Sequence, residues 1–406
     1  MRVLAVNAGS SSLRAALFEL SENAALAQPG DALWSACVRW GSLPARADLE
    51  WTFAGGSRRR TVRLESAGAA ADALIAAFAA NSPTKRRAPE ADVVAHRVLH
   101  AGAALREPAL VTTSVKATIR RHLAYAPENN RAALSAMAAA RRELGNVVQV
   151  AVFDSGFHAT IGEAAAAYPG PYAWRERLGL RRIGFFGESH RYAAARAAQM
   201  LDTGPAPLRV VACHLGRSTS LAAVAGGISR DTTMGYTPLE GPMMAASAGS
   251  IDPGLLLHFA GERYGPERLR RVLADESGLR GLSGIAAGAL EVERAAAAGD
   301  ARASLALEVY AHRLRAAVAA MAAAMDGVDV LTFSGGIGEH SARTRAAACR
   351  GLGFLGIRLD DGANAAAAGD AEVGAAGAAA RVLVVRAQEE WAVACAARRL
   401  LHGGLG

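Results

Sequence analysis

Residues 1–20 read MRVLAVNAGSSSLRAALFEL, and this stretch decides the expected fold. The apolar residues 3–6 predict a strand, the polar and glycine-containing residues 7–12 predict a turn, and residues 13–20 predict a second strand. The same order of strand, polar turn and strand returns at residues 208–224. Two similar α/β lobes with a central cleft are the simplest architecture that uses this pattern twice.

The remaining elements alternate between strands and helices. Further strands are expected at residues 33–40, 51–62, 93–99, 147–153 and 328–333. Helices are expected at residues 69–80, 114–124, 130–143, 252–264, 303–325 and 389–401, and the last of these is expected to pack on the first lobe. Residues 362–380 are rich in alanine and glycine, which predicts a surface loop or a weak helix.

Composition excludes several classes of protein. With 51% hydrophobic and 20% charged residues, the chain can build a core, so global disorder is excluded. Apolar runs such as residues 316–325 are far shorter than the roughly 20 residues of a membrane helix. The first residues lack the features of a signal peptide, so we expect a cytoplasmic protein. The four cysteines have no paired spacing and predict reduced core thiols.

The net charge of +8 raises the question of a nucleic-acid partner. Nearly all of the basic residues are arginines scattered along the chain. The dense run Arg58-Arg59-Arg60 has no interleaved aromatic residues. We therefore expect no nucleic-acid partner.

Two polar turns have the composition of anion-binding loops. Residues 7–12 (NAGSSS) offer backbone N–H groups and hydroxyls to an anion, although an ordinary hairpin turn has the same composition. Residues 334–339 (SGGIGE) follow a strand and precede a helix expected from about Ser341, which suits backbone approach to a nucleotide. Glycine-rich turns are common, so each turn by itself leaves both interpretations open.

Several charged residues stand where chemistry is plausible. Asp154 ends a buried strand, where a carboxylate holds Mg²⁺, acts as a base or simply forms a turn. Glu389 and Glu390 either bind a metal or cap the last helix, and His214 is either catalytic or a half-buried histidine. Arg97 lies on an apolar strand and needs an anion, which is either a structural partner or a bound carboxylate or phosphate.

Taken together, these motifs are specific, and the chain resembles the acetate kinase family over nearly its whole length. The matching segments are residues 6–13 (VNAGSSSL), 96–102 (HRVLHAG), 152–158 (VFDSGFH), 184–192 (GFFGESHRY), 213–216 (CHLG), 231–241 (DTTMGYTPLEG), 334–339 and 388–390 (QEE). The resemblance implies the duplicated actin-like ATPase fold of the acetate and sugar kinases, Hsp70 and actin. It also implies a homodimer and the phosphorylation of a small carboxylate by ATP with Mg²⁺.

The resemblance also implies a division of labour. Residues 1–156 with 388–406 would form the acceptor and phosphate lobe, and residues 157–387 would form the nucleotide lobe and the dimer interface. Residues implied at the acceptor are Arg97, Leu99, Glu128, Asn129, Phe185, Phe186, Pro238 and Ser247. Residues implied at the phosphates and nucleotide are Ser10, Ser12, Arg14, His214, Gly216, Gly335, Gly336, Gly338 and Glu339. Asn7, Asp154 and Glu389 would organise Mg²⁺, and Asn7, Arg97 and Asp154 would act in the transfer itself.

The chain departs from the family at groups that stabilise the transferring phosphoryl. Ser247 replaces the family's second active-site arginine, Phe186 the histidine of its Gly-Phe-His-Gly-Thr motif, and Asn129 the histidine of its Ala-Pro-Leu-His-Asn-Pro motif. Losing one such donor typically costs about 10²–10³ in rate, so we expect ordinary acetate kinase activity to be poor or absent. Around the nucleotide, Arg217 follows His-Leu-Gly where the family has asparagine, and residues 283–290 lack the aspartate and arginine that border adenosine.

Because Asn7, Arg97, Asp154 and Glu389 are retained, we interpret the departures as a change of specificity. Two hypotheses follow. Arg217 supplies the positive charge lost at Ser247. Glu128, as a buried carboxylate, makes the acyl pocket polar and favours an acceptor that carries an amine or guanidine. The alternatives are a catalytically silent homologue that binds a ligand or partner, and an enzyme of this fold with another phosphoryl donor.

Overall fold

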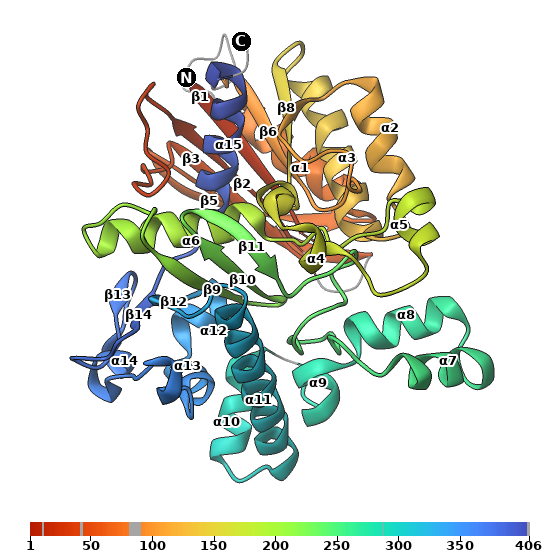
Figure 1. The fold of residues 1–406 in the computed structure, drawn as a ribbon. Coiled ribbons are helices and arrows are strands. Elements are labelled where there is room, and N and C mark those ends of the chain that lie inside the picture. The colour runs from red at the N-terminus through yellow and green to blue at the C-terminus, as the bar shows by residue number, and fades with distance from the viewer. Residues whose placement is uncertain (10–11, 41–43, 81–90, 287, 404–406) are drawn as a thin grey trace. The chain divides into compact units, whose positions relative to one another are not determined.

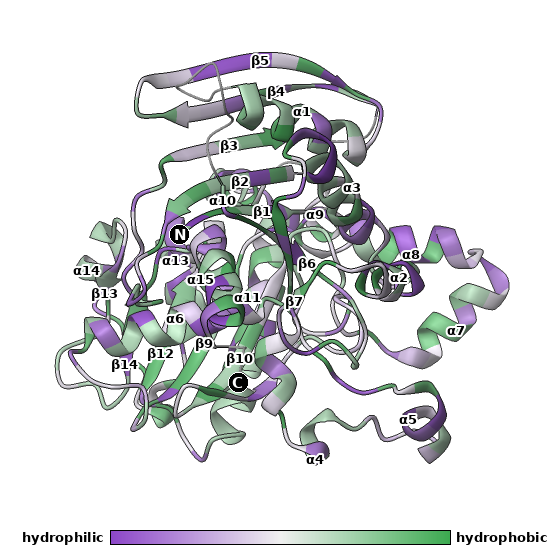
Figure 2. Ribbon diagram, turned by 90° about the horizontal axis from the view of Figure 1, so that it is seen from above, coloured by the Kyte–Doolittle hydropathy of each residue, from purple (hydrophilic) through white to green (hydrophobic). Residues whose placement is uncertain are grey.

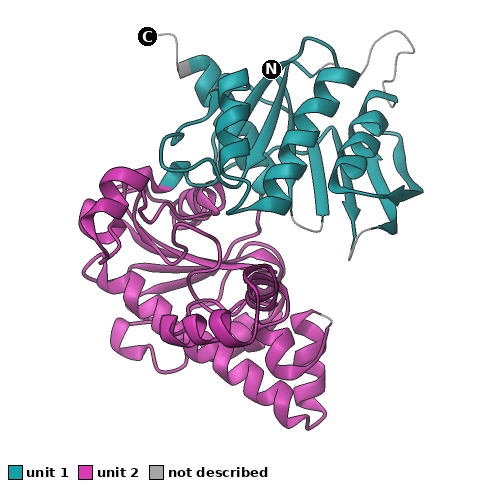
Figure 3. Ribbon diagram, turned by 90° about the vertical axis from the view of Figure 1, so that its right-hand side faces the viewer, with its two compact units in different colours: residues 1–157, 388–406 teal, residues 158–387 magenta. Residues whose placement is uncertain are grey.

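The computed structural model describes residues 1–9, 12–40, 44–80, 91–286 and 288–403, and it contains two β-sheets (Figure 1). Each sheet belongs to one of two units, Met1–Phe157 with Gln388–Gly406, and His158–Ala387 (Figure 3). The strands of the first unit are β1 (Arg2–Ala8), β2 (Ser12–Glu19), β3 (Trp34–Arg39), β4 (Ala45–Phe53), β5 (Gly56–Leu64), β6 (Val93–Val98), β7 (Ala109–Leu110) and β8 (Val148–Phe153). Those of the second unit are β9 (Arg209–Leu215), β10 (Thr219–Ala225), β11 (Ile228–Thr232), β12 (Val330–Ser334), β13 (Ala371–Glu372) and β14 (Arg381–Val384).

The two sheets have the same topology. The order β3-β2-β1-β6-β8-β7 of the first sheet corresponds strand by strand to the order β11-β10-β9-β12-β14-β13 of the second. In each, a three-stranded antiparallel meander is followed by two strands parallel to β1 or β9, and a short antiparallel strand lies at the edge. The duplication predicted from the repeated strand, turn and strand is therefore confirmed, and β4 and β5 are additions to the first sheet.

Helices cover the faces of both sheets. Those of the first unit are α1 (Ala67–Ala80), α2 (Thr113–Arg121), α3 (Pro127–Glu143) and α15 (Glu389–Gly403). Those of the second unit are α4 (Glu163–Ala166), α5 (Tyr172–Leu178), α6 (Gly187–Met200), α7 (Pro253–Glu262), α8 (Pro266–Asp275), α9 (Gly278–Ser283), α10 (Ala289–Ala297), α11 (Ala301–Ala323), α12 (Gly335–His340), α13 (Ala342–Cys349) and α14 (Asp361–Ala366). Short 3₁₀ helices span Gly156–Thr160 and Gly353–Leu355.

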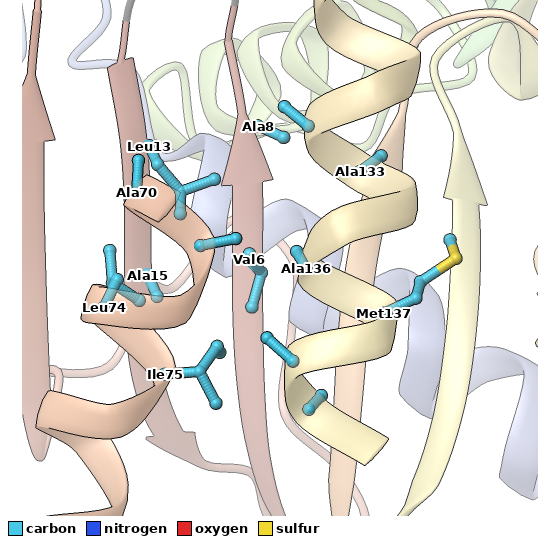
Figure 4. Close-up of a cluster of buried hydrophobic side chains, with 14 of the residues drawn as sticks. Val6, Ala8, Leu13, Ala15, Ala70, Leu74, Ile75, Ala133, Ala136 and Met137 are labelled. Carbon is cyan, nitrogen blue, oxygen red and sulfur yellow. The ribbon is translucent and has the colours of Figure 1, made fainter. Parts of the chain in front are cut away.

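Alternation along β1 decides which side chains reach the core and which reach the opposite face. Val6 of β1 and Leu13 of β2 belong to one buried hydrophobic cluster with Leu74 of α1 and Met137 of α3 (Figure 4). Since successive residues of a strand point to opposite faces, Asn7 points away from this core, toward the side on which α15 packs on β1. The expected packing of the last helix on the first unit is confirmed by Trp391, whose ring meets Phe18 edge-on at 5.3 Å between centroids.

The second sheet is organised in the same way. Cys213 and Leu215 of β9 pack with Tyr310 and Leu314 of α11 in one buried cluster. His214, between them in sequence, points to the opposite face and meets α6. In both units the strand that leads into the polar turn is buried on both faces, and the face opposite this core ends in a polar side chain, Asn7 in β1 and His214 in β9.

Two expectations about single segments are wrong. Residues 51–62 are not one strand, because β4 ends at Phe53 and β5 begins at Gly56, whose φ of +124° suits glycine. The resulting hairpin places the arginine-rich β5 at the sheet edge, where Figure 2 shows it mostly in the hydrophilic colour. Charge on an edge strand opposes pairing with other chains. Residues 362–380 contain the end of α14 and the strand β13 rather than a single loop or weak helix.

Among the described residues, none of the helices combines the length and the apolar character that a bilayer crossing requires.

Acid should destabilise the first unit through His96 of β6. This side chain is 1% exposed, its Nε2 lies 2.8 Å from Gln149 Oε1, and burial lowers its pKa to about 4. An unfolded histidine has a pKa of about 6.5, so between these values the unfolded chain binds a proton that the folded chain does not. Stability should fall by about 2 kcal/mol from pH 7 to pH 5 through this group. Urea unfolding followed by tryptophan fluorescence measures the loss.

His96→Gln should flatten that pH dependence. Four of the five tryptophans, Trp34, Trp40, Trp51 and Trp391, lie in the first unit, so the signal reports mainly on it. Burial also lowers the pKa of His190 in the second unit, so some acid sensitivity should remain. Equal slopes of stability against pH in parent and variant would contradict the assignment.

Candidate functional site

Three polar side chains gather at the carboxyl ends of the parallel strands in the first unit. Asn7 of β1 is the register partner of Arg97 of β6, and Arg97 is the partner of Val152 of β8, two residues before Asp154. Carboxyl ends of parallel strands lie at one edge of a sheet, which is where α/β folds bind ligands. The topology therefore unites residues that are about 90 and 57 positions apart in the chain.

Arg97 and Asp154 form a buried bidentate ion pair. The guanidinium donates from Nε to Asp154 Oδ1 at 2.7 Å and from Nη2 to Oδ2 at 2.6 Å. The two side chains are only 11% and 4% exposed. Burial alone lowers the pKa of Arg97, but the Asp154 carboxylate, helped by Glu389 and Glu390, raises it above the ordinary value. The first interpretation of Arg97, a structural ion pair, is therefore confirmed, with Asp154 as the partner. An anion bound at Arg97 would share the guanidinium with Asp154.

Asn7 connects this ion pair to the start of the last helix. Its Oδ1 accepts from Arg97 Nη1 at 2.9 Å, and its Nδ2 donates to Glu389 Oε2 at 2.9 Å and to Glu390 Oε1 at 3.0 Å. Both glutamates lie in the first turn of α15, where the helix dipole favours carboxylates. Burial, and next the Glu389 carboxylate, raises the pKa of Glu390 above its usual range. The result is a continuous polar chain from Asp154 to α15.

The first polar turn borders this chain. Gly9 N–H donates to the Ser12 carbonyl oxygen at 2.8 Å, which closes the turn between β1 and β2. Ser10 lies outside the described residues. Arg14 of β2 faces the glutamates of α15: burial lowers its pKa, but Glu390 and Glu389 raise it above the ordinary value. Arg14, which was expected at the nucleotide, therefore interacts electrostatically with Glu389 and Glu390.

The oxygen atoms of this region suit Mg²⁺. In proteins Mg²⁺ prefers oxygen ligands and usually binds one or two carboxylates together with substrate phosphates. Asp154 and Glu389 supply carboxylate oxygens, and Asn7 supplies an amide oxygen. In the part of the chain that the structure describes, no three His, Cys, Asp or Glu side chains converge as a ready-made metal cluster. The donor set therefore fits an ion shared with a nucleotide rather than a structural metal.

The acceptor residues of the first unit are only partly as expected. Leu99 is 8% exposed, and Asn129 donates from Nδ2 to the Ala8 carbonyl oxygen at 3.3 Å, which brings α3 to the end of β1. The expectation that Glu128 is a buried carboxylate is wrong. Its side chain is 56% exposed in the first turn of α3, and Arg131 lies 3.9 Å away, because the helix turns position 128 outward.

In the second unit, Phe186 covers His214 at the end of β9. The two rings stack with centroids 4.5 Å apart, and His214 Nδ1 lies 2.9 Å from Ser189 Oγ of α6. Phe186 has a φ of +58°, an unusual backbone conformation for an aromatic residue, directly before α6 begins. Phe185, the residue before it, is fully buried.

Arg217 lies beside the segment that carries Ser247. The Arg217 carbonyl oxygen accepts from Ala245 N–H at 3.3 Å, and its guanidinium is 58% exposed and 3.8 Å from Asp275. Within the described residues the Ser247 hydroxyl is buried and has no hydrogen-bond partner. Pro238 lies in the loop after β11, part-buried like its neighbours.

The glycines of the second unit meet at the carboxyl ends of β9 and β12. Gly335 has a φ of +76°, and a Cβ there would lie 2.8 Å from the Leu215 carbonyl oxygen, so only glycine fits. The backbones of the two turns lie close together, because a Cβ added to Gly216 would be 4.0 Å from the backbone nitrogen of Gly336. The helix expected from about Ser341 is confirmed, because Ser341 is the N-cap of α13, but the glycine-rich residues before it form a further short helix, α12, that the sequence did not predict.

Two charged residues that hold loops of the second unit could not be recognised from the sequence. Arg345 of α13 is 1% exposed and donates to the carbonyl oxygens of Gly338 and Glu339, whereas Arg343, two residues earlier, is exposed. Glu240 accepts from Tyr168 and from Arg182, each at 2.6 Å, and so holds the loop that contains Pro238. Nothing in the spacing of these residues separates them from surface charges.

Comparison with known proteins decides the family. The sequence model of the acetokinase family matches residues 2–395. The chain belongs to the acetokinase family. The acetate kinase of Trichormus variabilis is 43% identical over 405 residues, covering 99% of this chain and 100% of that protein. The acetate kinase of Gloeobacter violaceus is 44% identical over 405 residues, covering 97% and 98%.

Solved structures agree. An acetate kinase from Porphyromonas gingivalis has a TM-score of 0.85 at 32% identity, covering 98% of this chain and 99% of that one. A propionate kinase from Francisella tularensis has a TM-score of 0.86 at 27% identity, covering 97% and 98%. This acetokinase therefore has the expected actin-like fold and is a kinase that transfers a phosphoryl group from ATP to a carboxylate, with Mg²⁺ as cofactor.

Removing Arg97 from the acetokinase should destabilise the first unit. Arg97→Met leaves the Asp154 carboxylate buried without its cation, which should cost about 3–5 kcal/mol. Urea unfolding monitored by tryptophan fluorescence measures the change. Arg97→Met combined with Asp154→Leu removes both charges, so it should cost less than the sum of the single variants. An unfolding midpoint of Arg97→Met equal to that of the parent would show that the pair does not carry stability.

Proposed function

We propose that this acetokinase phosphorylates a polar carboxylate that bears an amino or guanidino group in preference to acetate. One contrast carries the proposal. The chain Asp154–Arg97–Asn7–Glu389 is complete, while the positions of three neutralising groups of the family hold Phe186, Asn129 and Ser247. If the protein had lost its activity, substitutions should have accumulated among the retained residues as well as at the three altered positions.

The retained residues suit the transfer. Asp154 and Asn7 hold the guanidinium of Arg97 in one orientation, so it presents a fixed positive charge without reorganisation. We assign Arg97 to the carboxylate of the acceptor, because phosphoryl transfer depends on positioning and on positive charge around the migrating group. Mg²⁺, held by Asp154 and Glu389, supplies charge for the phosphates when it is bound.

The altered residues suit another acceptor. The Phe186 ring, stacked on His214, offers an apolar surface and no hydrogen-bond donor. Glu128 has only a weak ion pair, with Arg131 at 3.9 Å and both side chains more than half exposed. A carboxylate so placed, one residue before Asn129, is suited to a cationic group on the acceptor.

Turnover with a panel of carboxylates tests this function. Mg-ATP is offered with acetate, propionate, amino acids and guanidino acids, and hydroxylamine traps any acyl phosphate. We expect at least one amino- or guanidino-substituted acid to exceed acetate in kcat/KM. Asp154→Asn should abolish the product, because it removes the charge that orients Arg97. Glu128→Gln should reduce the preference for the cationic acceptor and leave acetate turnover unchanged.

Acetate as the best acceptor would overturn the proposed specificity while leaving the kinase assignment intact. No product from any acceptor, with a melting temperature that Mg-ATP does not raise, would favour a silent homologue or another phosphoryl donor, since a ligand that binds the folded state must stabilise it.

We further propose that Arg217 supplies the charge that Ser247 lacks. The backbone contact between Arg217 and Ala245 keeps the two segments adjacent, and an exposed guanidinium near Asp275 can turn without burial cost. Arg217→Glu should lower kcat by about 10²–10³, the usual cost of a lost charge-stabilising donor. Arg177→Glu, the same charge change at an exposed position of α5, is the control. Unchanged turnover in Arg217→Glu would refute this role.

A homodimer and a cytoplasmic location complete the proposal. Neither α7 nor α8 has a buried residue, and Leu257 of α7 is 76% exposed, which suits helices covered by a second copy. The four cysteines are free thiols, as expected of a reducing compartment.

A further inference from the structure

The nucleotide turn of the second unit is an intrinsically weak helix. α12 has six residues, and three of them, Gly335, Gly336 and Gly338, are glycines. Each glycine disfavours a helix relative to alanine, and a helix of this length has no stability of its own in water. Its conformation must therefore be imposed by neighbouring groups.

Glu339 fixes the first end of this helix. Its Oε1 accepts from the Gly335 N–H at 2.9 Å, so the carboxylate of the last turn folds back to the first helical N–H. A negative charge at a helix N-terminus is favourable. This N–H is consequently already engaged by the protein, and a phosphate bound at the turn would have to use other groups.

Arg345 fixes the other end. The guanidinium donates from Nη1 to the carbonyl oxygens of Gly338 at 2.8 Å and Glu339 at 2.9 Å, and from Nε and Nη2 to Asn364 at 2.7 Å each. Burial lowers the pKa of Arg345 below its ordinary value. A positive charge at the C-terminus of α12 complements the negative charge at its N-terminus, so both ends of the turn are held.

The same oxygen of Glu339 has a second partner far along the chain. Oε1 also accepts from the Ala387 N–H at 2.9 Å. Ala387 is the last residue of the second unit, two residues before Glu389. The preceding N–H groups are held as well, that of Val385 by the Phe333 carbonyl oxygen at 2.8 Å and that of Arg386 by Asp370 at 2.6 Å.

We propose that Glu339 is a positioning residue that joins the nucleotide turn to the point where the chain leaves the second unit. One carboxylate oxygen ties the Gly335 N–H to the Ala387 N–H, so a change at the turn is transmitted to the backbone that leads to Glu389. Both hydrogen bonds depend on the reach of this oxygen acceptor, and the charge adds only the modest interaction with the helix dipole. It differs from the direct contact with the nucleotide expected from the family position.

Two substitutions separate reach from charge. Glu339→Gln keeps a carbonyl oxygen at the same distance from the backbone and loses the charge. Glu339→Asp keeps the charge and withdraws the oxygen by one methylene. We expect Glu339→Gln to retain the Mg-ATP affinity of the parent within about twofold, and Glu339→Asp and Glu339→Ala to weaken it about tenfold. The Mg-ATP dependence of the melting temperature measures the affinity without an acceptor, so the result does not depend on the proposed acceptor.

Hydrogen–deuterium exchange provides a second readout. In Glu339→Asp, exchange should rise together in peptides that contain Gly335 and Ala387, and in Glu339→Gln it should stay at the parent level. Glu308→Gln and Glu308→Ala, at an exposed position of α11, are the matched controls. If Glu339→Gln is impaired and Glu339→Asp is not, Glu339 acts through its charge and the proposal is wrong. If exchange rises at only one of the two peptides, the carboxylate does not join them.

Discussion

The ion pair between Arg97 and Asp154 is the interaction around which the first unit is arranged. It joins the ends of β6 and β8, orients Asn7, and through Asn7 reaches the glutamates that begin α15. Burying two charges costs several kcal/mol per ion, and an apolar pair of similar size would often be as stable. A rigid cation between carboxylates is therefore better explained by chemistry than by stability, because a kinase needs fixed positive charge where phosphate and carboxylate meet.

Because the sheet is duplicated, each unit has an equivalent set of strand ends, and the residues at these ends differ between the two units. In the first, the ends of β1, β6 and β8 carry charged and amide side chains. In the second, the ends of β9 and β12 carry His214 and glycines, of which Gly336 has open space where a Cβ would lie while the Gly335 N–H is bound by Glu339. Side-chain charge suits a metal and a carboxylate, whereas bare backbone suits a nucleotide. One topology thus supports two kinds of recognition.

The departures from the family are concentrated in neutral side chains. At the position where the resemblance implies a histidine, the Phe186 ring stacks on His214, and Ser247 leaves a buried hydroxyl without a partner in the described part of the chain. The loop that contains Pro238 is held by other groups, since Glu240 accepts from Arg182 and Tyr168. Specificity can therefore change at these positions while the ion pair of the first unit stays intact.

The sequence by itself determined the duplicated α/β architecture, since alternation and polar turns are local signals. Its ordered motifs also indicated Asn7, Arg97, Asp154 and Glu389, which the structure joins by hydrogen bonds. It misplaced the burial of Glu128 and did not predict the short helix α12, because helix rotation and stabilisation by distant groups are not local properties. Only the tertiary structure decided that Arg97 pairs with Asp154, that Arg345 is buried, and that Glu339 bonds Ala387. Hydrogen bonds between residues tens or hundreds of positions apart depend on which strand ends the fold brings together.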